Sequence, residues 1–510
     1  MLLRRSHGAF TRCRPARMPR TVRCQLPPGK GNRDDRYDAR AAGEDVTGLT
    51  VMTALEIARA VRDGRVSPVD VVQAHLARID RLEPQIRAFQ VVLAEQALAE
   101  ARRLAAHPGL AGLPLAGVPV AIKDNVNVAG TPTRHGSAAT PAEAAPADDE
   151  LVRRLRAAGC VIIGKTQMPE LAIWPFTEPQ AYPATRNPWD TERTPGGSTG
   201  GGAAALASGM AALALGSDGG GSIRIPAACC GVVGLKPGPG VVPLAGGMDS
   251  HWYGLTEFGP LARTVADTAA ALDVLTGTAA HATAAVANRP LRIAYSLTAA
   301  ALGARLDPAA RAAVEDTAAA LREAGHQVVR SRPPIPANLG LRFMSRWLAG
   351  IAQDAAGLPT GALEERTVKM ARRGERMARK VKPASADPFA TRAAGWISGF
   401  DALIMPTLAR PAVPIGTWAG KGWFLAPPQR RQLAVHHAVE PHRAAGHLRP
   451  GSRQRIAGRR PDRGTGGRRA GDPRHCRRTG AAQALAAARS PRRGSMITKE
   501  NGRQGSPDLS

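Results

Sequence analysis

Residues 148–166, DDELVRRLRAAGCVIIGKT, place a helical pattern directly before a buried strand. Apolar side chains such as Leu151 and Leu155 recur at helical spacing behind acidic residues, and Gly159 is typical of the position just past a helix end. Residues 160–163 are apolar and mostly β-branched, which predicts a strand buried on both faces. This order of helix and strand indicates an α/β protein.

The same stretch contains the pattern G-x-x-x-x-G-K-T, which in other proteins forms a phosphate-binding loop. Such a loop binds phosphate through backbone N–H groups that a flexible turn leaves free. Here the residues between the two glycines form the predicted strand, so their N–H groups bond within a sheet. We therefore expect Lys165 to be a scaffold residue and not a nucleotide ligand.

Helix and strand patterns continue on both sides of this stretch. Residues 67–88 predict an amphipathic helix capped by Ser67, and residues 91–106 predict a second helix. The segment LAGVPVAIKDNV predicts a strand that delivers Lys123 to its end, and residues 291–332 predict a strand–helix–strand unit. The expected fold class is α/β, a single large domain with a mixed β-sheet core flanked by helices.

The positive charge of the chain is concentrated at its two ends. The formal net charge of the 510 residues is +28, but residues 51–420 hold 38 basic and 31 acidic side chains, a net charge of +7. We therefore divide the chain into a disordered basic leader (1–50), a folded domain (51–420) and an Arg-rich tail (421–510) that lacks the periodicity needed to fold alone. Nucleic acid is not expected as a partner of the folded domain, because the basic excess lies outside it.

The cysteines and the hydropathy pattern give an expectation for the cellular location of the protein. Six cysteines show no paired spacing, and no run reaches the roughly 18 apolar residues of a membrane helix. The first 33 residues are Arg-rich and free of acids, which loosely resembles a transit peptide, but they show no amphipathic period and no secretory core. We expect reduced thiols, no membrane association and a cytoplasmic location.

Two Gly-rich segments lie close together, GGSTGGGAAALASG (196–209) and GSDGGGSIRIPAACCG (216–231). The first lacks the glycine spacing and the later acidic residue of a dinucleotide site. In the second, residues 219–221 are glycines that lead into Ser222 and a short apolar helix. Consecutive N–H groups there can converge on one point, which is how an oxyanion hole is built from main chain.

A serine that attacks an amide needs a base to accept its proton. The body of the chain contains six histidines, but none lies in a comparable glycine-framed setting, and sequence distance leaves a spatial partner open. Lys123 is the other candidate, because burial at the end of an apolar strand disfavours the ammonium form of its side chain.

Three segments, GVPVAIKDN, TPGGSTGG and GSDGGGSIRIPAACCGVVGLKP, together closely resemble the amidase signature family of serine hydrolases. They agree with the family in residue type and in order, and Lys123 precedes Ser198 by 75 residues while Ser198 precedes Ser222 by 24. The resemblance covers roughly residues 51–420. It implies that Ser222 is the acylated nucleophile, that Ser198 follows a cis peptide bond and relays a proton, and that Lys123 is the neutral base.

The resemblance also implies the parts that surround this triad. Backbone N–H groups would hold the oxyanion, from Gly219, Gly220, Gly221 and Ser222, and the loop would be supported by Asp218 and Arg224. No metal and no cofactor are implied. Thr199 stands where many members have a second serine, and Gly219 where a larger residue is common. We expect both differences to be tolerated, because neither changes a reacting hydroxyl, amine or N–H group.

The implied function is hydrolysis of a small-molecule carboxylic amide to the acid and ammonia or an amine, and a homodimer is compatible with it. One alternative is the glutaminase (A) subunit of a tRNA-dependent amidotransferase, which uses the same triad. The segments SIRIP and GMDSHWYGLTEFGPLARTVAD look more like stand-alone amidases. Another alternative is an inactive remnant whose basic tail binds nucleic acid.

The family pattern fails after residue 420. Arg, Ala, Gly, Pro and His dominate there, and these residues are what GC-rich codons yield when they are read out of register. We hypothesise a frameshift near residues 424–430. Loss of the terminal core elements could exceed the whole stability of a domain, about 5 to 15 kcal/mol, so folding and activity of the product are not assured by the triad alone.

Overall fold

A computed structural model describes residues 47–284, 289–298, 305–383 and 388–419, all within the first of two compact units of the chain. The Arg-rich tail, the proposed frameshift and nearly all of the basic leader lie outside the described residues. The three-part division of the chain therefore stays a prediction.

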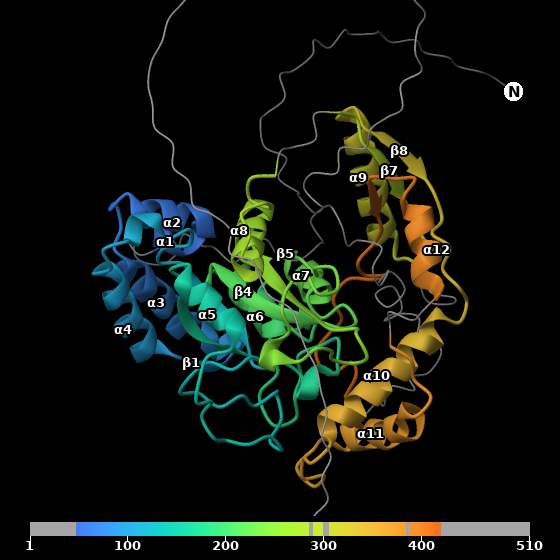
Figure 1. The fold of residues 1–510 in the computed structure, drawn as a ribbon, viewed down its shortest axis with the longest axis horizontal. Helices are drawn as coiled ribbons and strands as arrows, with labels where there is room; N and C mark the ends of the chain where they lie inside the picture. Colours follow the sequence, from blue (N-terminus) through green and yellow to red (C-terminus); the bar gives the residue numbers. More distant parts are fainter. Residues whose placement is uncertain (1–46, 285–288, 299–304, 384–387, 420–510) are drawn as a thin grey trace, which may run out of the picture. The chain divides into compact units, whose positions relative to one another are not determined.

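A six-stranded mixed sheet forms the centre of the described fold (Figure 1). Its strands lie in the order β1 (Phe89–Val92), β3 (Val161–Thr166), β2 (Pro119–Lys123), β4 (Leu213–Asp218), β6 (Glu257–Ala262) and β5 (Val233–Gly234). Strand β2 runs parallel to both β3 and β4, whereas β1 is antiparallel to β3 and β6 is antiparallel to β4 and β5. The predicted α/β fold with a mixed sheet is confirmed.

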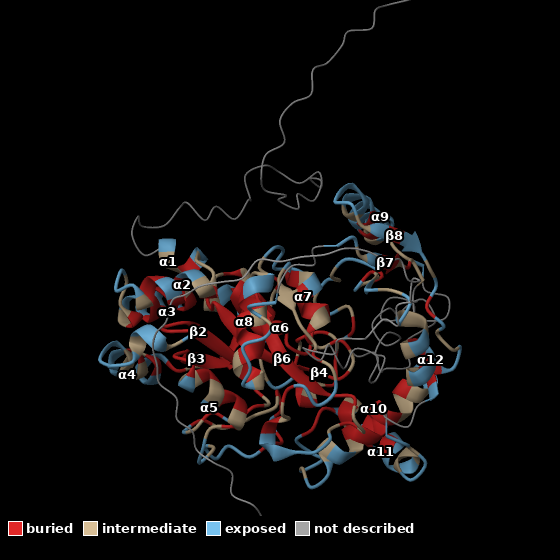
Figure 2. Ribbon diagram, turned by 45° about the horizontal axis from the view of Figure 1, so that its top comes forward, coloured by how far each residue is buried: buried red, intermediate tan, exposed pale blue. Residues whose placement is uncertain are grey.

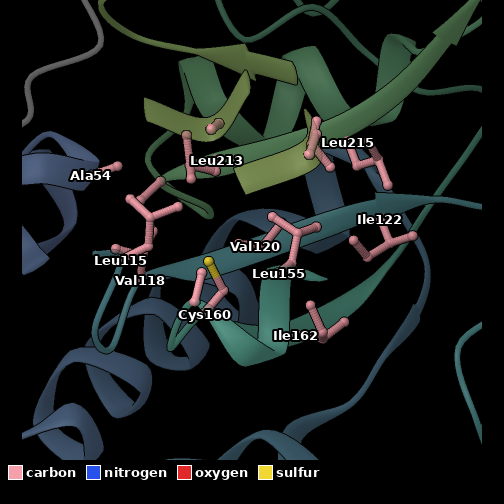
Figure 3. Packing of buried hydrophobic residues seen from close by; sticks show 14 of the residues in the cluster. Ala54, Leu115, Val118, Val120, Ile122, Leu155, Cys160, Ile162, Leu213 and Leu215 are labelled. Atoms are coloured by element: carbon pink, nitrogen blue, oxygen red, sulfur yellow. The ribbon is translucent and has the colours of Figure 1, made fainter. Parts of the chain in front are cut away.

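Alternate side chains of the central strands enter two separate hydrophobic layers. Val120, Ile122 and Ile162 belong to the layer shown in Figure 3, with side chains from α2 (Ala54–Arg62), α5 (Glu150–Ala157) and α8 (Val265–Thr276). Ala121 and Ala214 belong to the opposite layer, with α3 (Pro68–Ile86), α4 (Ala94–Ala105), α6 (Gly200–Ala207) and α7 (Arg224–Cys230). Both faces are covered, which is why these strands are mainly apolar up to their polar carboxyl ends and are buried, as Figure 2 shows.

A second sheet contains three parallel strands, in the order β8 (Gln327–Arg330), β7 (Arg292–Tyr295) and β9 (Ala402–Ile404). Helix α9 (Pro308–Glu323) connects β7 to β8, so the predicted strand–helix–strand unit is confirmed. The unit does not extend the main sheet, however, and the expectation of one sheet is incomplete. The remaining α-helices of the described residues are α1 (Thr47–Val51), α10 (Leu339–Ala355), α11 (Glu365–Ala378) and α12 (Pro388–Ile397).

The helix predicted over residues 91–106 is wrong at its beginning. Residues Phe89–Val92 form β1, which pairs with the outer side of β3, and α4 begins only at Ala94. Sheet pairing overrides the helical pattern here, because the aromatic and β-branched side chains of FQVV suit a strand. The helix capped by Ser67 is confirmed, since the Ser67 side chain accepts a hydrogen bond from the N–H of Val69.

Strand β3 includes Gly164, Lys165 and Thr166, the last three residues of the phosphate-loop pattern. The Lys165 side chain is fully buried, and its Nζ lies 2.8 Å from Asp124 Oδ1 and donates to the Pro132 carbonyl at 2.8 Å and to Thr133 Oγ1 at 2.7 Å. Lys165 therefore ties the loop after β2 to the sheet, as expected for a scaffold residue. Within the described ranges, no helix combines the length and hydrophobicity that a bilayer crossing requires.

Candidate active site

The parallel pairing of β2 and β4 brings two sequence-distant polar groups to one edge of the main sheet. Lys123 is the last residue of β2, and Asp218 is the last residue of β4. The carboxyl ends of parallel strands meet at the same edge, which is where sites in α/β folds usually lie. Ser198 arrives at this edge just before α6, and the peptide bond between Gly197 and Ser198 is cis.

The Lys123 amine is fully buried among hydroxyl and carbonyl oxygens. Its Nζ lies 2.7 Å from Ser198 Oγ, 2.8 Å from Ser217 Oγ and 3.3 Å from the Ser217 carbonyl. The Asn125 side chain also donates to Ser217 Oγ, at 3.0 Å. Sequence reasoning missed Ser217 and Asn125. The available signal was a polar residue next to the end of the apolar strand LALGSD, and an amide two positions after the predicted base.

Burial lowers the pKa of Lys123 from its usual value to about 7, although the Asp218 carboxylate attracts the ammonium form and opposes this shift. Desolvation wins because no carboxylate contacts the amine directly among the described residues. At neutral pH a large fraction of Lys123 is therefore an uncharged amine with a free lone pair, the form that can accept a proton.

The loop between β4 and α7 carries Ser222, which lies beside the Ser198 segment because the N–H of Thr199 donates to the Ser222 carbonyl at 3.0 Å. Ser222 keeps partial exposure, whereas Ser198 is fully buried. The Ser222 hydroxyl makes no hydrogen bond to another described residue, so the structure does not join the two serine hydroxyls directly. Catalytic hydrogen bonds are often incomplete without substrate.

The four predicted oxyanion donors are not equivalent. The N–H of Gly221 donates to Asp218 Oδ1 at 2.6 Å, so the expectation that Gly221 faces an oxyanion is corrected. The N–H groups of Gly219, Gly220 and Ser222 have no acceptor among the described residues. Three amides of one tight turn are therefore left for a ligand.

Asp218 and Arg224 contact this turn and each other. The Asp218 carboxylate accepts from the N–H groups of Gly221 and Ile223 and forms a two-pronged ion pair with Arg224, with both N···O distances at 2.9 Å. Burial alone would raise the pKa of the Asp218 carboxyl, but the Arg224 guanidinium outweighs it and holds that pKa well below its usual range. Asp218 therefore stays charged and keeps the turn closed.

A cavity of about 300 Å³ opens beside Asn125, with walls that include His135, Leu171, His251 and Asp354. Burial lowers the pKa of His135 to about 4, so this imidazole is neutral at pH 7. Among the described residues, no group of three or more His, Cys, Asp and Glu side chains is arranged to hold a metal ion.

The sequence places this chain among the hydrolases of C–N amide bonds. The sequence model of the family described as Amidase matches residues 70–429, so the chain belongs to the amidase (amidase signature) family. The predicted family membership is confirmed.

Two relatives and one solved structure illustrate the likeness. "Putative amidase AmiB2" of Mycobacterium tuberculosis is 48% identical over 340 residues, which cover 65% of this chain and 73% of the relative. The glutamyl-tRNA(Gln) amidotransferase A-type subunit of Carboxydothermus hydrogenoformans is 45% identical over 235 residues, which cover 45% of this chain and 47% of the relative. The structure of 6-aminohexanoate cyclic dimer hydrolase with its substrate is similar with a TM-score of 0.67 at 31% identity, covering 78% of this chain and 89% of that one.

Proposed function

We propose that this protein hydrolyses a small carboxylic amide to the acid and ammonia or an amine, through an acyl-enzyme on Ser222. The observation that carries the proposal is the buried contact of 2.7 Å between Lys123 Nζ and Ser198 Oγ, in a chain of the amidase family. The lone pair of a neutral amine can take a proton from this hydroxyl, and Ser198 can in turn take one from Ser222.

The two halves of the reaction use the same groups. Ser222 Oγ bonds to the amide carbon while its proton passes through Ser198 to Lys123, and the carbonyl oxygen becomes an oxyanion. The free N–H groups of Gly219, Gly220 and Ser222 stabilise that charge. The C–N bond then breaks as Lys123 returns the proton, by way of Ser198, to the departing nitrogen. A water molecule attacks the ester by the same relay, and the acid leaves.

Labelling with a serine-directed fluorophosphonate tests this assignment. We expect one covalent adduct on Ser222 in the intact protein, no adduct in Ser222→Ala, and labelling slowed by a factor of about 100 or more in Lys123→Ala, because removal of the base affects the same step. Ser208→Ala is the matched control, since the Ser208 hydroxyl donates to carbonyls of α6 and lies outside the network. An adduct on another residue would overturn the proposal.

A second candidate is the glutaminase subunit of an amidotransferase, favoured by the similarity to the Carboxydothermus protein. Glutamine would be the substrate, and ammonia would pass to a partner protein. Ammonia release from glutamine, compared with a panel of simple aliphatic and aromatic amides, separates the two functions. A preference for glutamine above all other amides would favour the second candidate, whereas hydrolysis of simple amides at higher kcat/KM would favour the first.

A further inference from the structure

The indole of Trp252 lies between the loop that bears Ser222 and helix α10. A Cβ atom added to Gly219 would stand 2.9 Å from Trp252 Cε3, and one added to Gly350 of α10 would stand 2.6 Å from Trp252 Cγ. Neither distance leaves room for a side chain. The two glycines therefore let two backbones pack closely against different atoms of one indole.

Trp252 is fixed from several directions. Its side chain is almost fully buried, its Nε1–H donates to Asp354 Oδ2 at 2.6 Å, and its ring stacks on His251 at 5.3 Å between centroids. His251 bonds in turn to Asp354 Oδ1 at 3.0 Å and to Thr256 Oγ1 at 2.8 Å. The backbone of Trp252 is left-handed, with a φ of 49°, a conformation that a bulky residue adopts only when its surroundings enforce it.

We propose that Trp252 is a positioning residue that sets the place of the Gly219 N–H group, an inference that rests on the proposed function of that group as an oxyanion donor. The Gly219 amide has no hydrogen-bond partner among the described residues, so its orientation depends on packing. The ring and Thr256 Oγ1, which would also lie 2.9 Å from a Cβ at this position, occupy the space into which the turn would otherwise relax. A donor held before the charge develops stabilises the transition state without reorganisation.

The test compares kcat and KM for an amide that the intact protein hydrolyses. Removal of the ring in Trp252→Ala is expected to lower kcat by about 10- to 100-fold with KM changed less than about threefold, since the ground-state amide makes weaker use of the donor than the oxyanion does. Trp252→Phe, which keeps an aromatic ring against Gly219, is expected to recover most of this loss. The affinity for a trifluoromethyl ketone, which adds to serine and forms an oxyanion, is expected to fall in parallel with kcat.

Two further variants keep the inference testable if Trp252→Ala folds poorly. Gly350→Ala would place a methyl group against the Trp252 ring and force the ring or the helix to shift, so this variant is expected to lower kcat. Gly219→Ala alone is expected to lower kcat/KM, and the double variant Gly219→Ala with Trp252→Ala is expected to retain more activity than the product of the two single effects, because the second change makes room for the first. Phe343→Ala is the control, a buried aromatic residue of α10 outside the contact with Gly219.

The outcomes separate the two proposals. An intact protein that neither labels with a fluorophosphonate nor hydrolyses any amide overturns the proposed function and this inference with it. An active protein in which Trp252→Ala keeps kcat, or in which Phe343→Ala lowers kcat as much, overturns the inference alone. Multiplicative losses in the double variant would also contradict it.

Discussion

Lys123 illustrates how one buried group defines the candidate chemistry. The amine touches only neutral partners, the hydroxyls of Ser198 and Ser217 and one carbonyl. A carboxylate in direct contact would raise the pKa of the amine and keep it charged. The carboxylate of Asp218, which attracts the ammonium form, is instead bonded to Arg224 and to amides of the turn.

The pH dependence of activity follows from this environment. Because the pKa of Lys123 is lowered to about 7 and the deprotonated amine is the active form, kcat/KM is expected to rise with pH through about 7 and to level off above it. Lys123→Arg is expected to be inactive at every pH, since a guanidinium keeps its proton. Initial rates from about pH 5 to about pH 9 check the profile. A rate that is flat or falls with rising pH across that range would falsify the role of Lys123 as base.

Lys123, Ser198 and Ser222 could be named as candidates from the sequence, because each stands in a segment that resembles a motif of the family, and their roles belong to the proposed function. The contacts of Ser217 and Asn125 were harder to foresee, because a polar residue near a strand end and an amide near the predicted base do not show by themselves which group they face. The commitment of the Gly221 N–H to Asp218 was equally hidden. This hydrogen bond depends on the conformation of the turn, and three consecutive glycines are compatible with several conformations.

Helix α6 shows why a glycine-rich start need not bind a dinucleotide. A Cβ atom on Gly201 would stand 2.7 Å from both the backbone N and O of Gln167, next to β3. The glycines therefore allow α6 to pack closely on the sheet, and this packing sets the position of Ser198 immediately before the helix.

Replacement of Gly201 by alanine is expected to destabilise the protein by about 1 to 3 kcal/mol, because backbone atoms cannot move aside as a flexible side chain could. In Gly340→Ala, by contrast, the new Cβ meets nothing within 4 Å, so this substitution is expected to be neutral or stabilising by up to about 1 kcal/mol. Urea unfolding of the two variants measures both effects. Equal stability of the two variants would show that α6 does not need the close approach.

The buried ion pair between Lys165 of β3 and Asp124 of the loop after β2 leads to a prediction about stability. Both Lys165 and Asp124 are buried, so Lys165→Met leaves an unpaired carboxylate and is expected to reduce the free energy of unfolding by about 3 to 5 kcal/mol. The double variant Lys165→Met with Asp124→Asn removes both charges and is expected to lose less. Urea unfolding of the single and the double variant measures the two free energies of unfolding. A double variant that is as unstable as the single one, or less stable, would contradict the ion-pair account.

The described part of the chain contains two sheets of unequal burial. The strands β2, β3 and β4 are buried at every position, whereas β8 has one buried residue in four and packs in a small cluster with Ile293 and Ala318. Local opening costs less free energy where fewer apolar contacts are lost.

Hydrogen exchange is expected to reveal this difference. Backbone amides of β2, β3 and β4 are expected to exchange by global unfolding, and those of β7 and β8 by faster local opening. Mass spectrometry of peptides from the two sheets in one exchange series provides the comparison. Equal protection of β4 and β7 would show that both sheets unfold as one cooperative unit.

The amino-acid sequence by itself determined the class of fold, the family and the three residues of the proposed triad, because periodicity, caps and short motifs are local properties of the chain. Only the tertiary structure decided that residues 89–92 form an edge strand, that the strand–helix–strand unit makes a separate sheet, and that Trp252 packs against the loop that bears Ser222. These features arise from contacts between segments far apart in the chain. Such contacts depend on which surfaces meet after folding, and a local pattern carries no information about its distant partner.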